Sequence, residues 1–151
     1  MNAAADHSPL PHVPVTLFAS VMGLAGLGLA WRKGAALMGL PSLVGEAVLA
    51  VAALAFIAAV LTYGAKAVRF FPAVVGEFNH PVRSAFFSTI PIAILLLASG
   101  LYPYAAPAAL ILWVLGAVLQ LTLTIRLIVR WMVHKQEIHH VNAAWFIPIV
   151  G

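Results

Sequence analysis

Long apolar stretches alternate with short polar connections along this chain. Four stretches without charged residues run to about twenty residues each, which is the length that a membrane-spanning helix needs: Val13–Trp31, Ala47–Ala65, Ser84–Tyr102 and Tyr104–Ile125. Only helices, whose backbone groups pair internally, cross the hydrocarbon layer as separate segments. The pattern therefore predicts an all-α polytopic transmembrane helical bundle with four complete spans.

A fifth apolar run, Val141–Gly151, begins just before the sequence stops. It is too short to cross a bilayer. Either it lies at the membrane interface or it is the start of a fifth helix in a longer protein, and its rising hydropathy and Pro148 favour the second interpretation. We expect residues 1–151 to form a single transmembrane domain that is the N-terminal half of a larger one.

Composition excludes a soluble domain. Hydrophobic residues make up 64% of the chain and charged residues 8%, and the mean hydropathy is +1.05. A soluble domain of this size needs far more polar surface. The chain has no cysteine, which excludes disulfides and thiolate metal sites.

The basic residues indicate an orientation. They gather after the second and fourth spans, at Lys66, Arg69, Arg83, Arg126, Arg130 and Lys135, whereas the connection after the third span has none. The net charge of +4 could suggest nucleic acid, but this placement is typical of cytoplasmic connections, so we predict no nucleic-acid partner. The N-terminus would then be cytoplasmic, and the spans would pair as helical hairpins through short external turns.

Small residues form one stripe on the first span, at Ala19, Gly23, Gly26 and Ala30. Such stripes let helices pack closely in lipid. The stripe could equally let helices crowd round a narrow path, so both interpretations remain open.

Pro91 interrupts the third span. It cannot donate to the Phe87 carbonyl, so the sequence predicts a kink with one carbonyl left free. Ser84 and Ser88 precede Pro91 on one face and Ser99 follows it. These hydroxyls could wall a polar path, or they could merely satisfy the interrupted backbone.

The flanks of the third and fourth spans carry further candidates. Asn79 is predicted to cap the third span, and Arg83 could anchor it in headgroups or attract anions to a pore mouth. Arg126 and Arg130, one helical turn apart, are also mouth candidates. Gln120 is expected to be the most buried polar side chain and to bond between helices.

We expect no ionisable side chain deep in a span, which favours a passive path over a proton pump or ion-coupled carrier. The six histidines, His7, His12, His80, His134, His139 and His140, all lie in tails or connections. We therefore predict no metal, haem or other cofactor. Because no nucleophile and base stand in a recognisable order, we do not expect an enzyme.

Two segments, FNHPVRSAFFSTIPIAILL and HVNAAWFIPIVG, resemble the tellurite-resistance/dicarboxylate transporter family. This family includes TehA-like bacterial proteins, malate permeases, sulfite efflux pumps and plant slow-type anion channels. LFASVMGLAGLGLAW resembles the family's first helix more loosely. Where relatives often have a mid-helix proline in this span, the chain has Val21-Met22-Gly23.

The resemblance implies about ten helices around a central pore, with proline-kinked odd-numbered helices inside. Pro91 and Pro148 would then kink pore helices and Phe146 would lie near the path, with Gly23 and Gly26 lining it on the first helix. It also implies a bacterial inner membrane protein, transported small inorganic anions or dicarboxylates, and a homotrimer. The sequence leaves open a non-transporting membrane scaffold, a fragment without function, or an embedded haem protein.

Overall fold

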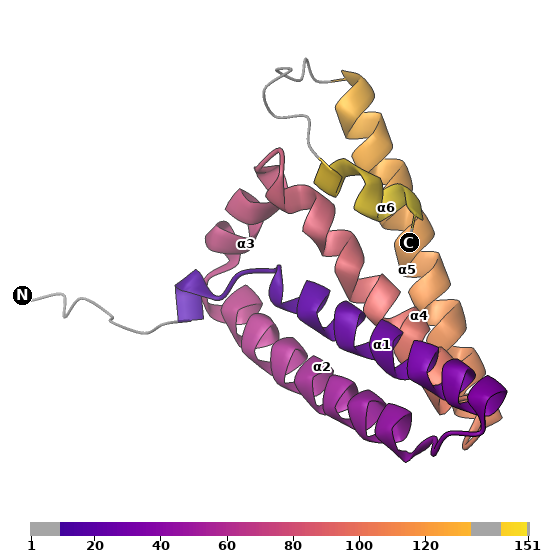
Figure 1. Cartoon of the computed structure of the whole chain (residues 1–151). Helices are drawn as coiled ribbons and strands as arrows, with labels where there is room; N and C mark the ends of the chain where they lie inside the picture. The colour runs from indigo at the N-terminus through magenta and orange to yellow at the C-terminus, as the bar shows by residue number, and fades with distance from the viewer. Residues whose placement is uncertain (1–9, 134–142, 151) are drawn as a thin grey trace, which may run out of the picture.

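Two helical hairpins make up most of the protein (Figure 1). The computed structural model describes residues 10–133 and 143–150. Helix α1 (Leu17–Met38) pairs with α2 (Leu43–Arg69), and α4 (Thr89–Leu101) pairs with α5 (Ala106–Val133). The all-α hairpin bundle predicted from the sequence is confirmed.

Shorter helices complete the described residues. They are the 3-10 segments η1 (Leu10–His12), η2 (Arg83–Ser88) and η4 (Ala143–Phe146), and the α-helices α3 (Phe71–Asn79) and α6 (Ile147–Val150). Helix α3 was not predicted. It begins with Pro72 in its first turn, where the missing proline N–H costs no helical hydrogen bond.

The two hairpin turns lie at the same end of the molecule, which we call the turn end (Figure 1). The α1–α2 turn begins at Gly39, whose φ of 68° is left-handed. The Gly39 and Leu40 N–H groups both donate to the Ala35 carbonyl, so the helix closes tightly. The opposite end carries the end of α2, α3, η2 and the last turns of α5, and we call it the basic end.

Three helical segments of the described residues are long and apolar enough to cross a membrane: Leu43–Arg69, Arg83–Leu101 and Ala106–Val133. The first predicted span forms a helix of 22 residues, α1. Helix α1 begins at Leu17 rather than Val13, so Arg32 and Lys33 enter any window of spanning length. Helices α2 and α5 also continue past their predicted ends at Ala65 and Ile125.

Helices α1 and α2 pack through glycine at one crossing and through aromatic rings at another. A Cβ on Gly28 would lie 2.7 Å from Leu49 Cγ, and one on Gly45 would lie 2.9 Å from the Gly28 carbonyl oxygen. Near the basic end, Phe18 meets Phe56 and Tyr63 edge to face at 5.9 Å. Glycine therefore brings the α1 and α2 backbones together where no side chain fits.

Helices α1 and α4 and the α6 segment form an inner row. Helix α4 contacts α1, and η2 at its start contacts α6. Helix α2 packs on α1, and α5 packs on α4 and α6. The odd-numbered spans of the sequence are thus neighbours, as the family resemblance implies.

Candidate functional site

Pro91 lies in the first turn of an α-helix rather than at a kink within one. The 3-10 segment η2 ends at Ser88, α4 begins at Thr89, and Pro91 is its third residue. The predicted free carbonyl of Phe87 is not free, because the Thr89 N–H points at the carbonyls of Phe86 and Phe87. The chain thus accommodates its proline by changing helix type.

Pro148 repeats this arrangement. The 3-10 segment η4 precedes α6, and Pro148 is the second residue of α6. The Pro148 carbonyl accepts hydrogen bonds from Gln120 Nε2 at 2.9 Å and Thr124 Oγ1 at 2.7 Å. Gln120 therefore bonds between helices as predicted. A cavity of about 380 Å³ lies beside these three residues.

The predicted hydroxyl face of the third span is divided between interior and surface. Ser84 and Ser88 are buried, while Ser99 is exposed and bonds to the Leu95 carbonyl of its own helix. Ser88 Oγ has no hydrogen-bond partner in the described part of the chain. Ser88 is also more buried than Gln120, so the prediction that Gln120 is the most buried polar side chain is wrong.

The two glycines of the small stripe on α1 face away from the other described residues. A Cβ on Gly23 or Gly26 would meet nothing within 4 Å there, so neither glycine makes a close helix contact in the described part of the chain. Phe146 is likewise 65% exposed. The close helix crossing uses Gly28 and Gly45 instead.

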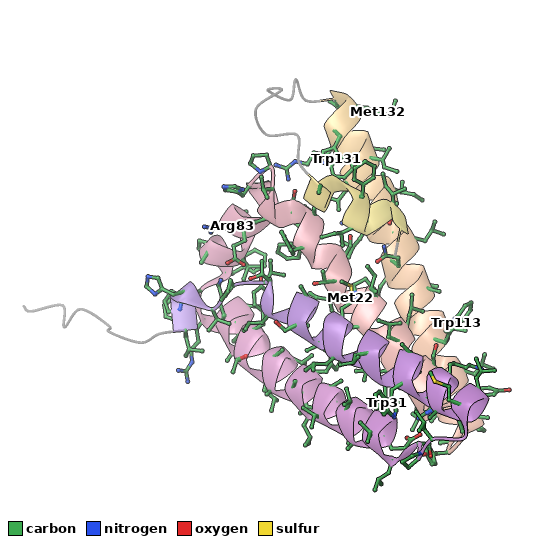
Figure 2. The ribbon with its side chains drawn as sticks, viewed as in Figure 1. Met22, Trp31, Arg83, Trp113, Trp131 and Met132 are labelled. Carbon is green, nitrogen blue, oxygen red and sulfur yellow. The ribbon has the colours of Figure 1, made fainter. Side chains whose placement is uncertain are left out.

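The three arginines predicted for a pore mouth differ in their surroundings: two are exposed and one is hydrogen-bonded to α3. Arg83 and Arg126 are exposed, and Figure 2 shows Arg83 at the basic end, far from Trp31 at the turn end. Arg130 is held by α3: its guanidinium donates to the carbonyls of Phe78 and Asn79, each at 2.8 Å. Arg130 thus joins α5 to α3.

His80, rather than Asn79, supplies the side-chain cap before η2. Its Nδ1 accepts hydrogen bonds from the N–H groups of Val82 at 3.2 Å and Arg83 at 3.3 Å, whereas Asn79 Oδ1 accepts from Arg130. An imidazole nitrogen can take the place of the expected amide oxygen because it is also an acceptor. Four histidines of the metal and haem argument, at 7, 134, 139 and 140, lie outside the described residues.

A buried ion pair, which sequence reasoning missed, lies at the basic end. Lys66 Nζ is 2.9 Å from Glu77 Oε1 and also donates to the Val13 carbonyl at 2.7 Å. Tyr63 donates to Glu77 Oε2 at 2.8 Å. Lys66 is 1% exposed and Glu77 8%, although both lie past Ala65, the predicted end of the second span. The only sequence signal is a pair of opposite charges that follows this predicted end.

A second ion pair joins both hairpins at the turn end. The Arg32 guanidinium donates to both Glu46 carboxylate oxygens at 2.7 Å and to the Gly100 carbonyl at 3.0 Å. The ring of Tyr104 lies 5.8 Å from the guanidinium carbon. The neighbouring Glu46 carboxylate raises the pKa of the Tyr104 phenol.

Comparison with known proteins identifies the family. The voltage-dependent anion channel family, SLAC1, matches residues 12–151. The chain is also 30% identical over 144 residues to the tellurite resistance protein TehA homolog of Haemophilus influenzae, an alignment that covers 95% of this chain and 44% of that protein. The chain thus spans less than half the length of this curated relative. The family match over residues 12–151 places the chain in the SLAC1 voltage-dependent anion channel family.

Proposed function

We propose that this chain supplies part of a passive route for anions across a membrane. The family match supports transport of anions, and the inner row of α1, α4 and α6 supplies three neighbouring segments for such a route. The row leaves Gly23, Gly26 and Phe146 uncovered. These residues would line the route from one side.

Ser88 is the observation on which this proposal chiefly rests. An unpaired hydroxyl in a protein interior is costly and rare. Ser88 is fully buried, it lies where η2 passes into α4, and its neighbours η2 and α6 are in contact. A small rotation of this junction would give the hydroxyl an anion or a water to donate to. Ser84 and Pro91, which lie in the same junction, would shape that place.

Charges at the basic end would draw anions in. Arg83 and Arg126 are exposed there, while Lys66 neutralises the one carboxylate of α3, Glu77. Exposed cations raise the local concentration of anions without binding them tightly, which permits fast release. Arg130, occupied by Phe78 and Asn79, would act on the route through the position of α5.

The same proposal covers the transported species, the membrane, the orientation of the chain and its assembly. The transported species would be small inorganic anions or dicarboxylates such as malate, or sulfite, and tellurite resistance would be a related property. The protein would lie in a bacterial inner membrane with its N-terminus in the cytoplasm, and it would assemble as a homotrimer. Residues 1–151 would form the N-terminal half of the transport domain.

Flux through proteoliposomes tests the proposal. The complete gene product that contains these residues is reconstituted, and the movement of chloride, nitrate, sulfite and malate is followed. We expect uptake driven by the anion gradient without a coupled ion. Correctly inserted protein that moves none of these anions would refute the proposal.

A non-transporting scaffold is distinguished by substitution at the junction. Ser88→Ala and Pro91→Ala should change anion flux if the junction lines a route. A scaffold would retain its assembly and show no flux in either form. Ser99→Ala is the matched control, because Ser99 bonds only to its own helix and should leave flux unchanged.

A further inference from the structure

An apolar groove runs down the junction of the two hairpins from the turn end. Its cavity of about 380 Å³ falls within the range of ligand pockets. One wall is a single stripe of α2, formed by Glu46, Leu49, Ala50, Ala53, Phe56 and Ile57. The opposite wall comes from α4 through Ile94, Leu97 and Leu101. Alanines on α2 leave the hollow between the walls. A Cβ on Gly100 would lie 3.2 Å from Leu49 Cδ2, so the two walls meet at that point.

The depth of the groove matches one leaflet of a bilayer. From Glu46 to Ile57 the α2 stripe rises about 16 Å at 1.5 Å per residue. Half of the hydrocarbon layer is about 15 Å. The groove therefore begins at the turn end and stops near the middle of the membrane, as a single acyl chain does.

The polar groups of the groove all lie at its outer end. Arg32, Glu46 and Tyr104 line that end, and the remaining lining is apolar apart from the backbone of Gly100. The side chains of Arg32 and Glu46 are 18% and 27% exposed, so both can be reached from outside. Their hydrogen bonds to one another and to Gly100 use three of the five N–H donors of the guanidinium.

We propose that this groove binds one acyl chain of a zwitterionic phospholipid, with the headgroup at the Arg32–Glu46 pair. The spare guanidinium donors and the Tyr104 hydroxyl face the phosphate, and the Glu46 carboxylate faces the ammonium group. The pair carries no net charge, which matches a headgroup without net charge better than an anionic one. A lipid held here would add contacts between α2 and α4 beyond the point where Leu49 packs against Gly100. Nothing in this proposal depends on anion transport.

Photolabelling in vesicles tests the proposal. The purified protein is reconstituted in phosphatidylethanolamine and phosphatidylglycerol vesicles that contain a trace of phosphatidylethanolamine with a diazirine on one acyl chain. Labelled peptides are identified by mass spectrometry. We expect label to concentrate on Ala50, Ala53 and Leu97 over Leu54 and Leu61, which are each 67% exposed on other parts of α2. Equal labelling of all these positions, or crosslinks from the groove to a second protein chain, would overturn the proposal.

Substitution of a groove alanine by a larger side chain provides the second test. Ala53→Phe places a ring in the groove and displaces acyl methylenes, so labelling of α4 should fall roughly tenfold if two methylenes lose their contacts. The matched control is Ala58→Phe, because Ala58 is an exposed alanine of the same helix outside the groove. Ala50→Leu serves the same purpose if Ala53→Phe does not insert. Unchanged labelling in a filled variant contradicts the proposal.

The headgroup is tested with the same diazirine chain on phosphatidylglycerol. We expect weaker groove labelling with this anionic probe than with phosphatidylethanolamine. Equal labelling by the two probes would overturn the assignment of a zwitterionic headgroup. Anion flux enters none of these measurements, so their failure and the failure of the transport proposal are separate results.

Discussion

The ammonium of Lys66 lies 2.9 Å from the carboxylate of Glu77, and this contact joins the end of α2 to α3. Tyr63 and the Val13 carbonyl complete the hydrogen bonds of the pair. Because Val13 leads into α1, one buried lysine holds three parts of the chain together. A buried pair need not stabilise a protein more than apolar side chains would, but the loss of one partner leaves an unpaired charge.

We therefore expect Lys66→Met to lower the free energy of unfolding by about 3–5 kcal/mol. Glu77→Gln should also be destabilising, and the double variant should lose less than the sum of the two. Unfolding of the purified protein in mixed micelles at increasing dodecyl sulfate gives all three values. Single losses below about 1 kcal/mol, the range of surface pairs, would contradict a buried pair.

Substitution at Gly45 tests the glycine crossing of α1 and α2. A Cβ there would lie 2.9 Å from the Gly28 carbonyl oxygen and 3.1 Å from the Arg32 nitrogen, both backbone atoms. Gly45→Ala should therefore cost about 1–3 kcal/mol of unfolding free energy. Gly23→Ala is the matched control, because a Cβ there meets nothing within 4 Å in the described chain. It should leave stability unchanged or raise it by up to about 1 kcal/mol.

Substitutions at the adjacent residues Ser88 and Thr89 distinguish an effect on anion flux from an effect on stability. Ser88 Oγ has no hydrogen-bond partner among the described residues, so Ser88→Ala should raise the free energy of unfolding by about 1–3 kcal/mol, the cost of burying an unpaired polar group. Thr89→Val removes a 2.6 Å hydrogen bond to the Phe86 carbonyl and should cost about 1 kcal/mol.

Under the transport proposal Ser88→Ala should also lower anion flux by up to roughly tenfold, the value of one hydrogen bond. The measurement is flux in proteoliposomes at matched protein density. A Ser88→Ala protein with full flux would show that the hydroxyl plays no part in the route.

Arg126 and Arg130 should differ sharply although they lie one turn apart on α5. Arg130→Gln loses hydrogen bonds to Phe78 and Asn79 and should cost about 1.5–3 kcal/mol. Arg126→Gln should leave stability within about 0.5 kcal/mol and should lower anion flux only at low ionic strength, where exposed charges are not screened. Equal effects of the two substitutions on stability would contradict the binding of Arg130 to α3.

The sequence predicts the features that depend on local pattern. The length of the apolar stretches and the composition of the turns between them predict the two hairpins. The alternation of short and basic connections predicts that both hairpin turns lie at the same end of the molecule. The interhelical bond of Gln120 was predicted because a lone amide in an apolar helix has few other partners. The boundaries were less accurate, since α1 begins at Leu17, after a local turn in which its N–H donates to the Pro14 carbonyl, and α2 continues to Arg69.

The features that the sequence does not reveal depend on tertiary contact. From the sequence alone, Lys66 is expected to be a cation in the connection after the second span. Its buried ion pair exists because α3 folds back and brings Glu77 beside it. Gly28 and Gly23 have similar neighbours along the chain, and only the crossing of α1 over α2 decides which one is covered. For Pro91 the pattern predicts that the helix is disturbed but not that a 3-10 segment precedes the proline. That segment depends on the hydrogen bonds made by the Thr89 N–H and by His80 Nδ1.

The change of helix type before Pro91 also sets how far the third span reaches. A 3-10 helix rises about 2.0 Å per residue against 1.5 Å in an α-helix, so it is longer for the same number of residues. The six residues of η2 and the thirteen of α4 together extend about 31 Å, where an α-helix of the same sequence would extend about 28 Å. This span is the shortest of the three, and its tighter winding brings its length to about the 30 Å of the hydrocarbon layer.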